Sequence, residues 1–354
     1  MARYKRYIES DVLTEAKARI HHIFDTHDTV AVMFSGGKDS LAVLHLTRMV
    51  AAERGIERIN AVFRDEELIP NVVIDFVAAH RREPWVKLEY YAIPLQSSMF
   101  VLGKVSGYVQ WDVNRPHIRP KPDFALVQEP GDDTIYDQWN ADEYICRRSG
   151  YKGKVAYLTG IRASEGLIRY RASVNKLNEN YINASSTPRV SLCKPIFDWE
   201  ENDLFKFFHD HEIRYCPIYD RQLWAHTSLR VATPMIAESA KRFNKLREID
   251  PTLYQQVVSI FPEMILQERY WQDIKRNAAS DVEKYGQTYD GVKAWVEENV
   301  TDPVWLDKAL TRLAGIVRRN AVDPGAYPPA YVFKFFRAGG YKRELMPIPK
   351  SERK

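Results

Sequence analysis

Thr29-Val30-Ala31-Val32-Met33-Phe34 runs directly into Ser35-Gly36-Gly37-Lys38-Asp39-Ser40, and these twelve residues are the strongest indication of the fold in the chain. The first half is a short apolar run rich in β-branched residues, which is typical of a buried strand. Apolar residues at helical spacing follow from Leu41 to Val50. A strand, a glycine-rich turn and a helix in this order predict the first unit of a parallel α/β sheet.

We call residues Ser35–Ser40 the glycine loop. Its two glycines allow a tight turn that brings backbone N–H groups towards an anion, and the helix after it points its positive end there. Lys38 adds a charge, Ser35 and Ser40 add hydroxyl donors, and Asp39 could hold magnesium or orient the loop. The loop therefore predicts a phosphate site. It is not of the Walker type, because Val32 stands where that motif has its first glycine. The alternative is a polar turn without a ligand.

Strands and helices also alternate before and after this loop. A helix is expected over residues 10–26, with Ser10 as a candidate N-cap. The predicted elements that follow are strands at 59–63, 86–93 and 154–159 and a helix at 72–79. They predict an α/β fold, a parallel twisted sheet with flanking helices. Residues 95–152 interrupt this alternation of strands and helices and are expected to form a lid or a binding insertion. Residues 174–188 are expected to form a loop.

The chain turns helical after about residue 236. Helical spacing is present at residues 236–248, 252–260, 264–285, 290–299 and 303–319. We therefore expect two domains, an α/β nucleotide-binding domain over 1–235 and a helical C-terminal region with a tail over 236–354. The tail, from residue 320, mixes aromatic and basic residues without a clear period. Such a mixture can bind nucleic acid, although packing onto the body is the simpler explanation.

A second polar cluster follows the strand predicted at 154–159. Its members are Gly160, Arg162, Glu165, Arg169 and Arg171. Ligands in open α/β sheets lie beyond the carboxyl ends of strands, so this cluster should face the glycine loop. Gly160 would permit close approach of a ribose or phosphate, the arginines would neutralise phosphate or sulfate oxygens, and Glu165 could brace Arg162 or Arg169. The alternative is a surface helix with ordinary ion pairs.

Two later stretches are predicted to be structural, with a direct catalytic role as the alternative. Lys194–Leu204 should start a helix with Asp198 as its cap. Arg214–Asp220 should form a turn whose tyrosine packs beside the site.

Composition excludes several classes of protein. The 354 residues carry 51 basic and 47 acidic side chains, a net charge of +4 that is too mild to prove a nucleic-acid partner. The three cysteines form no Cys-x-x-Cys pair, which argues against a zinc ribbon, a four-cysteine iron–sulfur cluster or a disulfide scaffold. Since no apolar run is long enough to span a bilayer and no signal core is present, a reducing cytoplasm is expected.

At these clusters the chain resembles the PP-loop ATP pyrophosphatase superfamily, and within it the phosphoadenosine-phosphosulfate (PAPS) reductase-like family, over roughly residues 10–265. The similar motifs are the glycine loop, Gly160–Arg169, Pro195–Asp203 with its Trp199, and Tyr219-Asp220. Trp111-Asp112, Arg119-Pro120 and Leu229–Ala232 further resemble the branch of immunoglobulin-binding regulator A type sulfurtransferases. The fold that this resemblance implies is Rossmann-like, of the adenine nucleotide alpha hydrolase type.

The resemblance also implies a ligand and a chemistry. An adenine nucleotide, ATP or one like PAPS, would lie between the glycine loop and the end of the second strand at Phe63, Arg64 and Asp65, with magnesium. It would be cleaved or recognised between its α- and β-phosphates. Relatives often act beside a ParB/sulfiredoxin-like partner.

Three functions remain open on the sequence. The leading one is adenylyl transfer with pyrophosphate release, with Lys38, Asp39, Arg162 and Arg169 as catalytic residues. The second is PAPS or adenosine-phosphosulfate reduction or sulfur transfer, with Cys193 or Cys216 as an unusual nucleophile. The reductases' C-terminal Glu-Cys-Gly-x-His motif is absent, because no cysteine follows Cys216. The third is a nucleotide-sensing regulatory subunit. The acceptor and the oligomeric state are not predicted.

Overall fold

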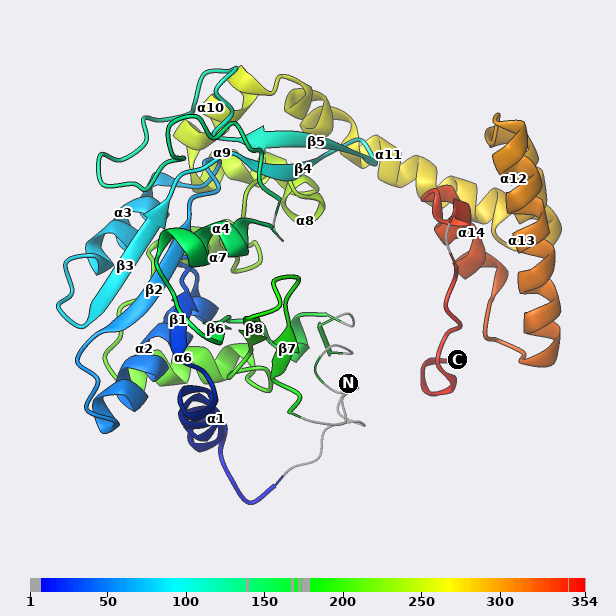
Figure 1. Ribbon diagram of the computed structural model, residues 1–354. Coiled ribbons are helices and arrows are strands. Elements are labelled where there is room, and N and C mark those ends of the chain that lie inside the picture. Colours follow the sequence, from blue (N-terminus) through cyan, green and yellow to red (C-terminus); the bar gives the residue numbers. More distant parts are fainter. Residues whose placement is uncertain are drawn as a thin grey trace. The chain divides into compact units, whose positions relative to one another are not determined.

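The computed structural model describes residues 8–137, 140–166, 169–170, 173, 179–342 and 344–353. It divides into two compact units, coloured along the chain in Figure 1: Met1–Val101 with Val105–Ile265, and Leu102–Lys104 with Leu266–Lys354. The boundary predicted after residue 235 falls inside the first unit. It does so because the short helices that follow residue 236 pack onto that unit's own α7 (Ile218–Trp224) and β4 (Leu95–Val101).

A six-stranded sheet forms the centre of the first unit. Its strands are β1 (Thr29–Met33), β2 (Ile59–Arg64), β3 (Val86–Tyr91), β6 (Val155–Leu158), β7 (Ile182–Ala184) and β8 (Val190–Cys193). They lie in the order β3-β2-β1-β6-β8-β7, parallel except for the edge strand β7. The predicted parallel α/β sheet with flanking helices is therefore confirmed. Strands β2 and β3, which follow β1 in the chain, lie on one side of it, whereas the later strands β6, β8 and β7 lie on the other side. The strand order therefore reverses between β1 and β6.

Helices cover both faces of this sheet. Among the described residues, the α-helices of the first unit are α1 (Val12–Thr26), α2 (Lys38–Glu53), α3 (Asn71–His80), α4 (Asn140–Arg148), α6 (Glu201–Asp210), α7 (Ile218–Trp224), α8 (Ala237–Ala240), α9 (Leu246–Ile249) and α10 (Pro251–Ile260). Successive residues of β1 alternate between two cores. Val30 and Val32 face α1, α2, α3 and α6, whereas Ala31 faces α4. This alternation is what a strand buried on both faces requires.

The insertion at 95–152 contains regular structure that the sequence did not predict. A separate two-stranded sheet is formed by β4 (Leu95–Val101) and β5 (Lys104–Gln110), and α4 lies near the end of the insertion. The strands of the hairpin bury few side chains, so they carry no alternating apolar pattern.

Three sequence-based details of the helices were wrong. Asp11, not Ser10, caps α1, because its Oδ1 accepts hydrogen bonds from the backbone of Leu13 and Thr14. Asp198 does not cap α6: both its oxygens pair with the guanidinium of Arg19 at 2.7 Å. Glu200 takes that place, in a reciprocal capping box with Asp203.

The third detail is the helix expected at 236–248. It is broken into α8, a 3-10 turn (η3, Phe243–Lys245) and α9. The break lets Phe243 turn inward, where its ring packs 5.2 Å from the ring of Tyr254.

The second unit is helical and has its own core. Helix α11 (Glu263–Tyr285) leads into it, and α12 (Tyr289–Asn299), α13 (Pro303–Val322), α14 (Pro329–Arg337) and the 3-10 turns η4 (Gly340–Lys342) and η5 (Lys350–Glu352) follow. Val296, Leu313 and Phe333 lie in its core. The predicted helical C-terminal region is confirmed, and α14 shows that the tail is partly helical. Among the described residues, no helix combines the length and apolarity needed to cross a membrane.

Candidate functional site

The glycine loop joins β1 to α2 at the carboxyl edge of the sheet. Gly36 has a φ of +74°, a conformation that favours glycine. A Cβ at this position would lie 2.8 Å from Cγ2 of Val77 and 2.9 Å from Cγ1 of Val73, both on α3. Gly36 is therefore required by the backbone conformation and by the close packing of α3.

The two serines of the loop are used to hold its shape. Oγ of Ser40 accepts a hydrogen bond from the backbone N–H of Ser35 at 3.1 Å and donates to the carbonyl of Gly37 at 3.0 Å. The two hydroxyl oxygens are 3.0 Å apart. Ser35 and Ser40 thus act first as internal braces.

Tyr219 supports the loop from α7. Its buried hydroxyl accepts the backbone N–H of Lys38 at 2.7 Å. A Cβ on Gly37 would lie 3.3 Å from the same hydroxyl. The sequence predicts a tyrosine beside the site, and the hydroxyl of Tyr219 does contact the glycine loop. The hydrogen bond itself joins residues 181 positions apart, so no local pattern could reveal it.

Gly160, just after β6, lies directly against the start of α2. A Cβ on Gly160 would be 2.5 Å from the carbonyl carbon of Asp39 and 2.6 Å from the backbone nitrogen of Ser40. The loops after β1 and β6 therefore meet, as predicted, where the strand order reverses. Crevices of this kind hold ligands in open α/β sheets. The close approach that Gly160 permits here is to the chain's own backbone.

Asp39 and Arg162 pair across this junction. Oδ1 of Asp39 lies 2.5 Å from Nε of Arg162, and Oδ2 lies 3.2 Å from Nζ of Lys38. The Arg162 side chain is only 6% exposed. Its Nη1 donates to Ser164 Oγ at 3.1 Å, which fixes the plane of the guanidinium. Three predicted site residues are therefore in direct contact.

Lys38 has acceptors that the sequence did not predict. Its Nζ lies 2.8 Å from the carbonyl oxygen of Leu229 and 3.4 Å from Oε2 of Glu201. The lysine is 4% exposed. To reach a phosphate, Nζ would have to exchange these contacts for phosphate oxygens.

Glu165 braces both arginines, as the spacing suggested. Its Oε2 accepts the backbone N–H of Arg162 at 3.0 Å and forms an ion pair with Nη1 of Arg169. Arg169 is 40% exposed, so its charge can still face a ligand. Arg171, which was also predicted to bind nucleotide, lies outside the described residues.

The end of β2 lies at the same edge of the sheet, but its side chains are already engaged. Phe63 is buried against Tyr90, and Arg64 pairs with Asp142 at 3.4 Å. Asp65 is buried, and its carboxylate lies 2.6 Å from Nη2 of Arg119. Burial raises the pKa of Asp65, while the guanidinium of Arg119 acts in the opposite direction. These predicted nucleotide contacts stay predictions, and the backbone of Asp65 is engaged as well, because its N–H donates to the carbonyl of Tyr91 at 2.8 Å and its carbonyl accepts Nε1 of Trp111 at 2.8 Å.

A buried ion cluster anchors the insertion to the end of β2. Glu67, which is fully buried, accepts both terminal nitrogens of Arg115 at 2.8 and 2.6 Å and the backbone N–H of Trp111 at 2.6 Å. Glu67 and Trp111 both have positive φ, at 59° and 53°. Non-glycine residues in this conformation are held there by their surroundings. In the sequence, Trp111 stands out only through the resemblance to the sulfurtransferase branch.

The cysteines are poor nucleophiles in this fold. Cys146, Cys193 and Cys216 are all fully buried. Burial raises the pKa of Cys193 to about 12 and that of Cys216 to about 11, and it also raises the pKa of Cys146. A thiol that stays protonated at neutral pH does not attack sulfur readily.

The donor set for magnesium fits poorly. Among the described residues there is no group of three His, Cys, Asp or Glu side chains that could hold a metal. Asp39 is the predicted ligand, and each of its oxygens already faces a cation. A metal carried by nucleotide phosphates would have to displace Lys38 or Arg162 to reach it.

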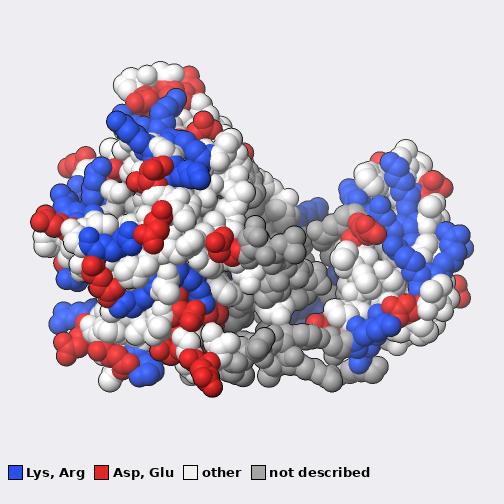
Figure 2. All heavy atoms as spheres, turned by 60° about the horizontal axis from the view of Figure 1, so that its bottom comes forward, with Lys and Arg blue, Asp and Glu red and all other residues white. Residues whose placement is uncertain are grey.

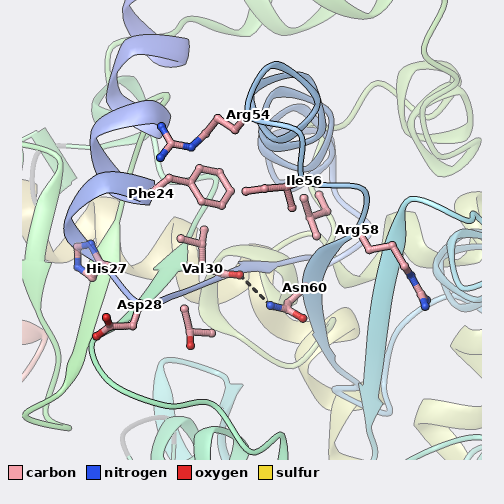
Figure 3. A pocket seen from close by; sticks show the side chains of 10 residues that line it. Phe24, His27, Asp28, Val30, Arg54, Ile56, Arg58 and Asn60 are labelled. Atoms are coloured by element: carbon pink, nitrogen blue, oxygen red, sulfur yellow. Dashed lines mark hydrogen bonds between the residues drawn. The ribbon is translucent and has the colours of Figure 1, made fainter.

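Cavities in the first unit include two that bear on the candidate site. One, of about 340 Å³, lies at the amino ends of β1 and β2, with Phe24, Val30 and Ile56 towards its centre (Figure 3). It is at the edge opposite the glycine loop. The other, of about 260 Å³, is lined by Val73 and Val231, which also touch the loop glycines. Neither cavity contains the Asp39–Arg162 pair.

Comparison with known proteins supports the resemblance to the PP-loop superfamily. The model of the phosphoadenosine phosphosulfate reductase domain matches residues 146–257, which include Gly160 and Tyr219 but not the glycine loop. The chain is similar to YbdN, an uncharacterized protein of Escherichia coli strain K12, with 28% identity over 244 residues. The match covers 65% of this chain and 59% of YbdN, so the chain spans about three fifths of the length of this relative.

The solved structures to which the chain is similar include the FMN adenylyltransferase of Candida glabrata, with 14% identity and a TM-score of 0.42 over 65% of this chain and 66% of that one. The PAPS reductase of Candida auris, in a phosphate complex, has 14% identity and a TM-score of 0.36 over 63% and 90%. At these values the similarity says nothing of substrate. None of the matches tests membership of the immunoglobulin-binding regulator A branch, which stays a prediction.

Proposed function

We propose that the chain binds an adenine nucleotide at the junction of the glycine loop and Gly160, and transfers its adenylyl group to an acceptor with release of pyrophosphate. The observation that carries this proposal is the direct contact of the two loops through Asp39 and Arg162 at the point where the strand order reverses. An anion placed there meets the N-terminus of α2 and at least two cations.

The chain's own residues would divide the work as follows. Phosphate oxygens are held by backbone N–H groups of the glycine loop and of the N-terminus of α2 other than those of Ser35, Gly37 and Lys38, which already donate to side-chain oxygens. Lys38 exchanges Leu229 and Glu201 for the departing pyrophosphate, and Arg162, with Arg169, neutralises charge that develops between the α- and β-phosphates. Asp39 positions Arg162 and Lys38. Magnesium would enter with the nucleotide, and no step is assigned to it, because the oxygens of Asp39 are occupied.

ATP is favoured over PAPS as the reacting nucleotide. Reduction of PAPS needs a thiolate that can reach sulfur, and Cys193 and Cys216 are fully buried with raised pKa values. Recognition of a nucleotide without turnover, alone or beside a ParB/sulfiredoxin-like partner, would use the same junction, and it is the outcome if no pyrophosphate is released.

Pyrophosphate release tests the proposal. Phosphate would be measured with malachite green after adding pyrophosphatase, for the wild type and for Lys38→Ala. The matched control is Lys206→Ala on α6, which removes a 75%-exposed lysine far from the loop in sequence. We expect Lys38→Ala to lower release at least tenfold and Lys206→Ala to leave it unchanged. Equal release from wild type and Lys38→Ala would refute the proposed role of the loop.

A further inference from the structure

Charge is distributed very unevenly along the chain. Residues 303–354 contain eleven Lys and Arg against four Asp and Glu, a net charge of +7. The preceding 302 residues contain 40 basic and 43 acidic side chains, a net charge of −3. The mild positive charge of the whole chain therefore conceals a strongly basic segment, all of it in the second unit.

Part of this charge gathers on one face of α13. Lys308, Arg312 and Arg319 are spaced by four and seven residues, which places them on the same side of a helix with 3.6 residues per turn. Ala309, Leu313 and Ile316 of the same helix point into the core, so the helix cannot turn this face inward. Figure 2 shows Lys and Arg gathered on the second unit, whereas the first unit mixes both signs.

The turn η4 adds a further cation beside this face. Nζ of Lys342 lies 5.2 Å from the ring centre of Trp305, and Nζ of Lys308 lies 4.9 Å from the same ring. Nη1 of Arg312 donates to the carbonyl of Tyr341 at 2.5 Å, which fixes the segment against α13. We call Lys308, Arg312, Arg319 and Lys342 the basic face.

Three charges of the basic face, those of Lys308, Arg319 and Lys342, are available to a ligand. Lys308 and Lys342 are exposed, and among the described residues neither has an acidic side chain within ion-pair distance. Arg319 is 45% exposed and pairs with Glu344, itself 74% exposed, at 3.3 Å. Such exposed pairs are weak and exchange readily for a stronger anion. A Cβ on Gly315, between Arg312 and Arg319, would meet nothing within 4 Å, so the helix surface is open there.

We propose that the basic face binds the sugar-phosphate backbone of a nucleic acid. Lys308 and Arg319 are separated by eleven residues, about 16 Å along the helix, a length that spans several phosphates of one strand. A membrane surface fits less well, because a helix that lies in a lipid interface presents apolar side chains beside its cations. Here the apolar stripe of α13 is in the core, and the ring of Trp305 is flanked by two lysines. The site is separate in sequence from the glycine loop and needs no nucleotide.

Fluorescence anisotropy of the full chain with a labelled single strand of about 20 nucleotides tests this. Wild type is compared with Lys308→Gln/Lys342→Gln and with the control Lys275→Gln/Lys293→Gln, which removes the same charge from α11 and α12. From about 50 to about 200 mM KCl, we expect wild-type affinity to fall steeply, and the basic-face variant to bind at least tenfold more weakly with a shallower log–log salt slope. The control should stay within about twofold of wild type.

Three results would overturn the proposal. They are no binding by wild type at the lowest salt concentration, equal loss in both double variants, or displacement of the strand by polyglutamate or by phosphatidylserine vesicles at matched charge. Circular dichroism of all three proteins establishes that the exposed substitutions leave the fold intact. Strand binding that survives Lys38→Ala would separate this surface from the proposed adenylyl transfer.

Discussion

Oδ1 of Asp39, in the first turn of α2, lies 2.5 Å from Nε of Arg162, which follows β6. The pair joins segments 123 residues apart and closes the junction where the strand order reverses. Because Arg162 is nearly fully buried, removing this carboxylate would leave a buried charge without its partner. The geometry of the site therefore rests on one ion pair as much as on the glycine loop.

Arg162→Lys should disturb this junction although it keeps the charge. Lysine has no Nε–H and no fork, so Asp39 and Ser164 cannot both be contacted. We expect a loss of about 1–3 kcal/mol in the free energy of unfolding, measured by urea denaturation. The control is Arg169→Lys, whose arginine is 40% exposed, and it should change stability by less than about 0.5 kcal/mol. Equal effects of the two substitutions would contradict a structural role for the pair.

Gly160→Ala should be far more harmful than Gly166→Ala. An added Cβ at Gly160 would lie 2.5 Å from the backbone of Asp39, whereas one at Gly166 would meet nothing within 4 Å. Overpacking of this kind costs about 1–3 kcal/mol, and it should also abolish nucleotide binding because α2 is pushed from the loop. Calorimetric titration with ATP measures the binding. If Gly160→Ala bound ATP as wild type does, the two loops could not form a single site.

Glu201→Gln should tighten nucleotide binding. Oε2 of Glu201 lies 3.4 Å from Nζ of Lys38 and competes with phosphate for it. Removing this competitor from a partly exposed position should raise the affinity for ATP by about two- to tenfold, of the order of 1 kcal/mol. Glu57→Gln, in the loop before β2, removes a charge far from Lys38 in sequence and serves as the control. Unchanged or weaker binding by Glu201→Gln would place the phosphates away from Lys38.

The cysteines should be inert in the native state. A thiol-specific reagent such as Ellman's should react with none of them at neutral pH until the protein unfolds, because all three are buried. Their pKa values also predict a pH dependence. Burial raises the pKa of Cys193 to about 12 and that of Cys216 to about 11, from the ordinary thiol pKa of 9.0. As pH rises, the unfolded state therefore loses these protons at a lower pH than the native state does.

Stability should therefore fall as pH rises above about 9. Cys193→Ala/Cys216→Ala should show a shallower fall with pH over that range than wild type, measured by urea denaturation. The variant should keep its pyrophosphate release. If the double variant lost pyrophosphate release, the result would support the hypothesis of reduction or sulfur transfer instead.

Local patterns in the sequence were sufficient to predict the central strand of the sheet and the helix after it. The apolar run before Ser35 and the helical stripe after Ser40 are properties of neighbouring residues, so β1 and α2 were predictable. The meeting of Gly160 with Asp39 was also predictable, because parallel strands bring their carboxyl ends to one edge of the sheet.

Contacts between distant segments were not predictable in this way. The hydroxyl of Tyr219 on the backbone of Lys38, the pairing of Asp198 with Arg19 and the anchoring of Trp111 by Glu67 depend on how whole elements pack. The competing acceptors of Lys38 belong to the same class, since Glu201 lies on α6 and Leu229 lies in a loop 191 residues away from Lys38.

The most direct test is a crystal structure of the full chain with α,β-methylene ATP, which resists cleavage between the α- and β-phosphates. The account predicts phosphate oxygens within hydrogen-bonding distance of the glycine-loop N–H groups and of the terminal nitrogens of Arg162, with Nζ of Lys38 moved away from Glu201. A nucleotide seated elsewhere, such as the cavity at the amino ends of β1 and β2, would contradict it. So would a glycine loop that stays empty at saturating nucleotide.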